Sequence, residues 1–180
     1  MNAFKKTKVD ALMEINAFSV AMFLLALATP LEAHSEDLPI KGWIEEAKIY
    51  PEAFPVKAKL DTGALTSSMD AKDIEYFEKD SERWVRFKVV AKNSDTNEET
   101  SHEFERPVLR KVKVRGAGGV DHRPVVLMKV CIGKQLLDEE FSLRDRKKMI
   151  YPVLIGRKTL EHVGPVDVRR KFTQEPDCKV

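Results

Sequence analysis

One acidic residue stands in a context that suits acid–base chemistry. Asp61 follows Lys57-Ala-Lys-Leu60, whose alternation of lysines with apolar residues predicts a β-strand, so its carboxyl group is presented where a strand ends. Gly63 permits a sharp turn, and the Thr62 hydroxyl can bond a neighbouring backbone group. Asp-Thr-Gly is also ordinary turn chemistry that arises by chance in roughly a few per cent of chains this long. The tripeptide alone could equally be a strand-to-turn junction.

A second motif, Leu154-Ile-Gly-Arg157, follows about ninety residues later. Together with Asp61-Thr-Gly-Ala64 it resembles the retropepsins, in which a β-hairpin flap separates these two motifs. With Arg123-Pro-Val-Val126 and Tyr151-Pro-Val added, the chain is similar to a bacterial retropepsin-like aspartic peptidase family, often labelled ATP-dependent zinc protease and linked to RimK-type glutamate ligases. The resemblance covers about residues 40–170. It implies an all-β fold, a closed acid-protease barrel with one short C-terminal helix.

The resemblance also implies a mechanism in which two carboxylates about 3 Å apart share one proton, one activating water while the other protonates the scissile carbonyl. Because the chain has one Asp-Thr-Gly, the second carboxylate must come from Asp61 of a twofold-related subunit, and a homodimer is expected. The implied catalytic residues are Asp61, Thr62 and Gly63, the implied substrate contacts include Ala64, Ile155 and Gly156, and Arg157 is structural. Leu65 stands where viral enzymes carry an Asp that pairs with this Arg, so Arg157 needs another partner.

A candidate flap lies between the two motifs. Two strand-like arms within residues 112–126 surround the tip Gly116-Ala117-Gly118-Gly119, whose glycines permit the mobility of a lid and whose backbone N–H groups could reach a substrate. A plain exposed hairpin explains the pattern equally well. Arg115 and Arg123 could favour an acidic peptide, but solvated surface charge is the commoner reason for such residues.

The rest of the chain reads as short β-strands. Runs rich in Val, Ile, Leu and aromatic residues alternate with charged residues, and Gly, Asn, Asp and Pro separate them, which indicates a barrel or sandwich. Helical signal is confined to residues 71–79 and 157–162. The spacing between the two motifs exceeds the viral one, which suggests an inserted polar hairpin around residues 93–101.

Other catalytic chemistries find little support. The four histidines share no zinc-ligand spacing, and there is no phosphate-binding Gly-x-x-x-x-Gly-Lys motif, so neither a metal nor another cofactor is expected. Ser67 and Ser68 suit the start of a helix better than a nucleophile. Cys131 is interpreted as a small buried hydrophobe. Cys178 lies in the polar tail at residues 171–180, where an oxidising compartment would permit a bridge between chains, although such a bridge is not favoured.

The N-terminal residues 1–33 are interpreted as a signal peptide, because lysines precede an apolar run at 17–28 that is too short to span a bilayer. Cleavage after Ala33 is preferred to cleavage after Ala28. An uncleaved anchor, translation starting at Met13 and a buried N-terminal helix remain alternatives. A periplasmic or secreted peptidase domain at 34–170 is therefore expected, with no stable membrane insertion after cleavage.

Composition fits one globular domain of this kind. The chain has 180 residues, and its 31 Lys and Arg against 29 Asp and Glu argue against a dedicated nucleic-acid binder. Two functions follow: a retropepsin-like aspartic endopeptidase acting on a peptide or protein substrate, or a catalytically inactive periplasmic binding or assembly module with the same fold. A link to an ATP-grasp glutamate ligase is the partner that the resemblance suggests.

Overall fold

The computed structural model describes residues 38–179 with gaps at 94–95, 97, 117–118 and 146–149. The predicted signal peptide lies outside the described residues, so its cleavage and the export of the chain stay predictions. Over the described part, no helix has the length and apolar character that crossing a membrane requires.

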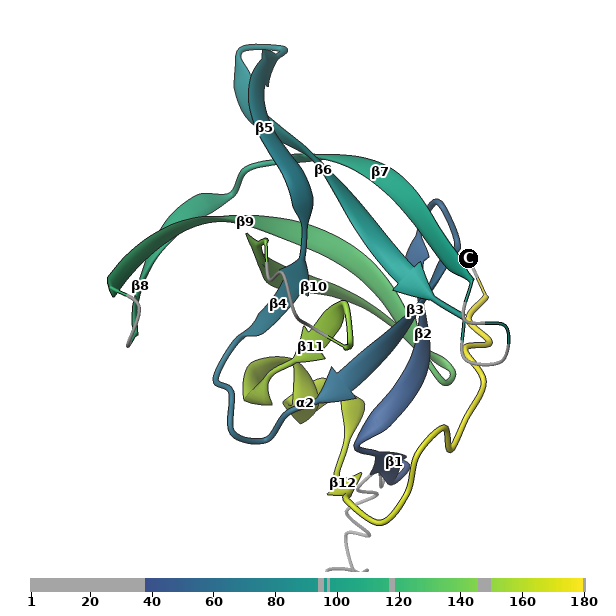
Figure 1. Ribbon diagram of the computed structural model, residues 1–180. Helices are drawn as coiled ribbons and strands as arrows, with labels where there is room; N and C mark the ends of the chain where they lie inside the picture. The colour runs from purple at the N-terminus through teal and green to yellow at the C-terminus, as the bar shows by residue number, and fades with distance from the viewer. Residues whose placement is uncertain (1–37, 94–95, 97, 117–118, 146–149, 180) are drawn as a thin grey trace, which may run out of the picture. The chain divides into compact units, whose positions relative to one another are not determined.

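Within the described residues, six strands close into a β-barrel (Figure 1). Their order is β10-β4-β11-β3-β2-β9, and β9 pairs again with β10. The closed barrel and the all-β class predicted from the sequence are confirmed. The strands are β2 (Ile44–Tyr50), β3 (Phe54–Leu60), β4 (Ser67–Asp70), β9 (Gly119–Ile132), β10 (Gln135–Arg144) and β11 (Val153–Ile155).

Alternation along the barrel strands explains why they close around a core. In β3, Phe54, Val56, Ala58 and Leu60 are buried, while the residues between them are more exposed. Because successive side chains of a strand point to opposite faces, this alternation directs one face inward. The helix α2 (Arg157–Val163) follows β11 directly and packs Leu160 and Val163 into the same core. The predicted short C-terminal helix is therefore confirmed.

The predicted hairpin is present. β8 (Arg110–Gly116) pairs antiparallel with the first half of β9, and the last pair is Gly116 with Gly119. The hairpin extends away from the barrel (Figure 1). Ala117 and Gly118, at its predicted tip, lie outside the described residues. Its role as a flap stays a prediction.

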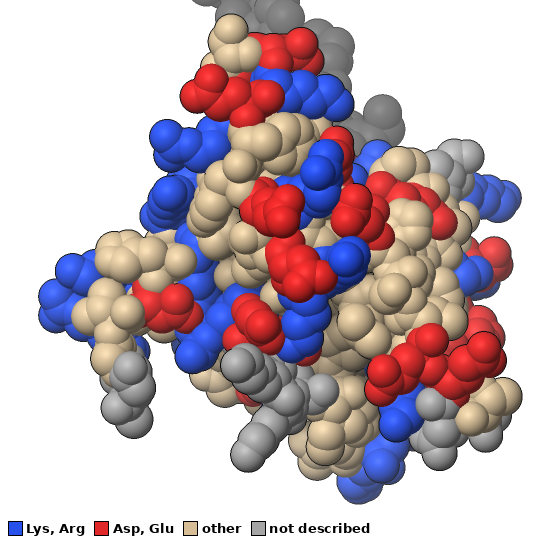
Figure 2. Space-filling view, turned by 45° about the horizontal axis from the view of Figure 1, so that its top comes forward, with Lys and Arg blue, Asp and Glu red and all other residues tan. Residues whose placement is uncertain are grey.

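A second sheet, formed by β5 (Lys72–Lys79), β6 (Glu82–Lys92) and β7 (Glu99–Pro107), packs on the barrel. Phe104 joins the two, because its ring stacks on Phe87 and meets Phe54 of β3 edge to face. The polar hairpin expected near residues 93–101 connects β6 to β7. The helix predicted at 71–79 is wrong, since these residues form β5. Figure 2 shows basic and acidic side chains interleaved on the face it presents.

The C-terminal residues are not a free tail. β1 (Lys41–Gly42) pairs parallel with β12 (Val166–Asp167), and residues 168–179, named here the C-terminal strap, continue along the barrel. The Phe172 N–H donates to the Ile44 carbonyl at 2.8 Å, and Cys178 forms a disulfide with Cys131 across 47 positions of sequence. Cys131 is buried, as expected, but sequence reasoning did not foresee its bond to Cys178 within the same chain.

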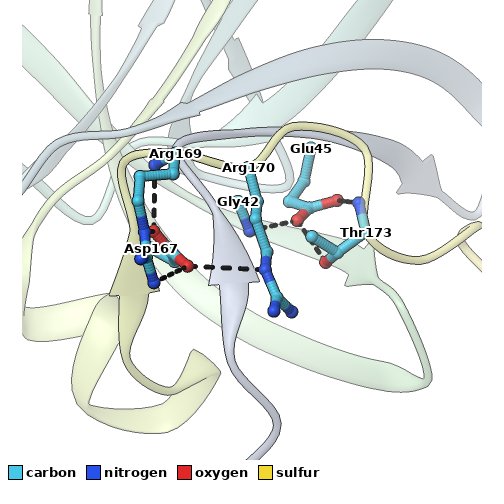
Figure 3. Close-up of polar contacts among 6 residues, drawn as sticks. All are labelled: Gly42, Glu45, Asp167, Arg169, Arg170 and Thr173. Carbon is cyan, nitrogen blue, oxygen red and sulfur yellow. Dashed lines mark hydrogen bonds and ion pairs between the residues drawn. The ribbon is translucent and has the colours of Figure 1, made fainter.

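Buried charges lie under the strap. Lys41 and Glu45 have no exposed area. Burial lowers the pKa of Lys41, and the nearby Glu45 carboxylate opposes that shift. The Lys41 ammonium donates to the Gln174 side chain at 2.6 Å, while Glu45 accepts from Gly42 N–H and from the N–H and hydroxyl of Thr173 (Figure 3). Because an unpaired buried charge strongly destabilises a fold, the strap is part of the folded domain.

Asp167, the last residue of β12 before the strap, gives the fold a testable acid sensitivity. Hydrogen bonds from the Arg169 guanidinium and backbone lower the pKa of Asp167 from 3.8 to about 2 (Figure 3). A carboxyl whose folded-state pKa is depressed stabilises the fold above its unfolded pKa and loses that contribution as the pH falls through the folded value. We expect Asp167→Asn to flatten the decline of the unfolding free energy between about pH 4 and pH 2.

Urea denaturation at several pH values measures this decline. Asp80→Asn makes the same chemical change in the exposed turn between β5 and β6 and serves as the control. It should retain the wild-type slope. An unchanged slope in Asp167→Asn would refute the assignment.

Candidate active site

Residues 61–66, named here the Asp61 loop, connect the end of β3 to the start of β4. Leu60 is buried, and the next N–H, that of Asp61, donates to the Ile155 carbonyl at 2.8 Å. A tight turn follows, in which the Ala64 N–H donates to the Asp61 carbonyl at 3.1 Å. The hydrogen bond to Ile155 therefore fixes the backbone of Asp61, and the tight turn sets the path of the backbone from Asp61 to Ala64.

The Asp61 carboxyl group has two defined partners. The Gly63 N–H donates to Oδ1 at 2.9 Å, and the Lys59 ammonium lies 3.3 Å from Oδ2. Partial burial acts to raise the pKa of Asp61, but the Gly63 hydrogen bond and the Lys59 charge together outweigh it, so the pKa lies below its ordinary value. Among the described residues, no other carboxylate bonds to Asp61, and the group is ionised at neutral pH.

The two sequence motifs meet in the structure. Arg157 N–H donates to the Ala64 carbonyl at 2.8 Å and Lys158 N–H to the Leu65 carbonyl at 3.1 Å. Gly156 lies against the backbone of Thr66, where a Cβ would come within 2.5 Å of the Thr66 carbonyl carbon. The segment 155–158 thus supports the Asp61 loop along its whole length.

The partner of Arg157 is backbone. Its guanidinium donates to the carbonyls of Thr62 and Gly63 at 3.0 and 3.3 Å. Leu65 is 55% exposed and takes no part in this contact. Arg157 therefore braces the loop through two backbone carbonyls rather than through an acidic side chain.

The close approach at Gly156 predicts a large loss of stability for a small change. In Gly156→Ala the new methyl group meets only backbone atoms of Thr66, and we expect the unfolding free energy to fall by about 2–3 kcal/mol through overpacking. Gly63→Ala is the matched control, because its Cβ would contact only the Asp61 side chain, at 3.1 Å. Thermal and urea denaturation compare the two variants, and equal losses would contradict this account.

A cavity of about 700 Å³ lies between the Asp61 loop and the hairpin. Its apolar wall includes Val112 and Val114 of β8 and Val125 of β9. Glu139 and His162 lie on its polar wall. The cavity has the size of a small-molecule or peptide side-chain site.

Only some of the residues predicted at the site line this cavity. Ala64 is part of its lining, whereas Asp61, Ile155, Gly156 and Gly119 are not. Ile155 and Gly156 are buried and support the loop instead. Sequence reasoning missed other lining residues because they carry no motif: Ser67, Arg110, Glu139, Glu140, Thr159 and His162.

Ser67 belongs to strand β4, so its predicted position at a helix start is wrong. Over the described ranges, no group of three or more His, Cys, Asp or Glu side chains has the arrangement of a metal site.

Comparisons with known proteins agree on the region that matches. A family model described as "Retropepsin-like aspartic endopeptidase RimB" matches residues 40–177. The crystal structure of a protein of unknown function from Legionella pneumophila has a TM-score of 0.64 and 32% identity, over 78% of this chain and 100% of that one.

Curated relatives carry a different name. A "probable alpha-L-glutamate ligase" from Desulfotalea psychrophila is 33% identical over 106 residues, 58% of this chain and 22% of that protein. Another of that name from Shewanella halifaxensis is 27% identical over 128 residues, 69% of this chain and 28% of that protein. The chain therefore spans only about a quarter of the length of these relatives.

Proposed function

Because the chain belongs to the family of the retropepsin-like aspartic endopeptidase RimB, we propose that it hydrolyses peptide bonds with water activated by the Asp61 carboxylates of two subunits. The observation that carries this proposal is the Asp61 loop. Its carboxylate is ionised, partly exposed and held at a strand end by Gly63 N–H, and the loop is braced by Arg157.

The lowered pKa of Asp61 applies to a single subunit, in which no acidic side chain bonds to this carboxylate. When two such carboxylates meet across a twofold axis, their repulsion raises the pKa of one of them, so the pair retains a single proton. The ionised member then takes a proton from water while the protonated member donates to the substrate carbonyl oxygen. Thr62 and Gly63 would form the contact between the two loops.

The cavity between the loop and the hairpin supports a peptide substrate. An extended peptide could lie as an added strand under the hairpin, with a side chain in the cavity beside Ala64. In this proposal the backbone of residues 116–119 closes over the peptide.

The relatives named as glutamate ligases suggest a substrate to try first. Such a ligase adds glutamate, so a peptidase linked to it would act on peptides that bear glutamate residues. We also propose that this chain is exported, which the Cys131–Cys178 disulfide supports because such bonds persist in oxidising compartments.

The test is a cleavage screen with the purified full chain. Peptides with glutamate tails are paired with otherwise identical glutamine-tailed peptides, and mass spectrometry locates each cut. We expect cleavage that a statine-type transition-state analogue blocks and a metal chelator leaves unchanged. Peptide binding without turnover would instead favour the second candidate, a binding or assembly module that retains the barrel.

The proposed dimer has its own test. Both cysteines of the chain are bonded to each other, so Thr62→Cys adds a single free thiol on the loop. If two loops meet on a twofold axis, mild oxidation should yield a covalent dimer. Glu82→Cys, exposed at the start of β6, should not, and equal cross-linking of both variants would refute the predicted interface.

A further inference from the structure

A continuous line of hydrogen bonds runs from the cavity wall to the segment that supports the Asp61 loop. The Gly156 N–H donates to the Ser67 hydroxyl at 3.0 Å, and the Ser67 and Thr159 hydroxyls lie 2.8 Å apart. The Thr159 hydroxyl donates to Glu139 Oε2 at 3.1 Å, and Glu139 Oε1 lies 2.7 Å from His162 Nδ1. The line joins strand β4, helix α2 and strand β10.

The direction of this line is determined by its chemistry. A hydroxyl carries one proton, and that of Thr159 goes to the Glu139 carboxylate. Ser67 must therefore donate to Thr159, which leaves the Ser67 lone pairs for the Gly156 N–H. Every donor points toward Glu139, and an ionised acceptor at the end strengthens each hydrogen bond behind it.

Burial makes the line important for the loop. Ser67 is 2% exposed, Thr159 is 3% exposed and the Glu139 side chain is 15% exposed. A buried hydroxyl that loses its partner is destabilised, so rotation of either one is opposed while Glu139 is in place.

Gly156 connects this line to the reaction centre. The carbonyl of Ile155, just before Gly156, accepts the Asp61 N–H, and the N–H of Arg157, just after it, donates to the Ala64 carbonyl. Fixing Gly156 through Ser67 therefore fixes two of the contacts that hold the loop, one at Asp61 and one at Ala64.

We propose that Glu139, which bonds to Thr159 and His162, is a positioning residue that aligns the Asp61 loop through Thr159, Ser67 and Gly156. His162 holds the second carboxylate oxygen and so orients the group. The inference rests on the proposed function for its catalytic consequence, but the alignment itself is a property of the folded chain.

The first experiment measures alignment without any substrate. Amide hydrogen exchange at Gly156 should become about tenfold faster in Glu139→Leu and in Thr159→Val, because the Ser67 acceptor is no longer held. Thr159→Ser restores the hydroxyl and should exchange as the wild type does. The matched control is Asp138→Leu, one residue earlier on β10, where a 56% exposed side chain pairs with Lys129 at 3.9 Å. It should leave Gly156 unchanged.

The second experiment measures catalysis in the same proteins. We expect kcat to fall by about tenfold in Glu139→Leu and Thr159→Val while KM stays within about twofold, the signature of a misaligned catalytic group. Thr159→Ser should recover kcat. A change confined to KM would assign Glu139 to substrate binding and overturn the positioning role.

Wild-type exchange at Gly156 in both Glu139→Leu and Thr159→Val would overturn the inference, as would equal acceleration in Asp138→Leu. Should the wild-type chain cleave nothing, the proposed function fails, but the exchange comparison still decides whether Glu139 aligns the loop.

Discussion

Asp61→Asn is expected to reduce kcat by about a thousandfold or more, because it removes the group that takes the proton from water. The change is nearly isosteric, and an Asn oxygen can still accept the Gly63 N–H. The lost ion pair with Lys59 is partly exposed, at 38% and 25% for the two side chains, so the unfolding free energy should change by less than about 1 kcal/mol. Steady-state cleavage and urea denaturation measure the two effects.

Subunit mixing turns this variant into a test of the paired site. If each site needs an Asp61 from both subunits, an equal mixture of wild-type and Asp61→Asn chains that exchange freely should keep about one quarter of the wild-type activity. Independent sites would keep about half. The control is Asp73→Asn, the same chemical change on β5, which should leave activity at the wild-type level in any proportion.

Removal of the Cys131–Cys178 disulfide is expected to lower the unfolding free energy by about 2–4 kcal/mol, because the bond closes a long loop and limits the unfolded chain. The released strap would also leave Lys41 and Glu45 without the Gln174 and Thr173 contacts. Urea denaturation with and without a thiol reductant measures the loss.

The double variant Cys131→Ala with Cys178→Ala distinguishes the effect of losing the disulfide from any other effect of the reductant on stability. It should unfold at the midpoint of the reduced wild type and should not respond to reductant. If reductant leaves the wild-type midpoint unchanged, the bond contributes nothing to stability and the account of the strap is wrong.

The sequence predicted those features that depend on local pattern or on a motif. The alternation before Asp61 predicted β3, the Gly-Arg motif preceded α2, and the paired apolar runs around Gly116 and Gly119 predicted the hairpin. In each case the residues that carry the signal lie close together in the chain.

The failures share a different cause. The spacing of Ile74 and Phe77 is compatible with a helix, but cross-strand pairing with β6 determines that these residues form β5, with a register shift between Lys72 and Glu75. The strap, which brings Cys178 to Cys131 with their Cα atoms 6.0 Å apart, depends on contacts remote in sequence. Arg157 bonds backbone carbonyls, which no pattern of side chains records.

The parallel pairing of β1 with β12 places the first and last strands of the domain side by side, and Lys41 also contacts Gln174 of the strap. A similar segment makes up about a quarter of the curated relatives and the whole of the Legionella pneumophila chain. After β12 the strap carries the chain along the barrel to Cys178, which is bonded to Cys131. The domain is therefore secured where the chain enters it by a pair of strands, and near its other end by a covalent bond.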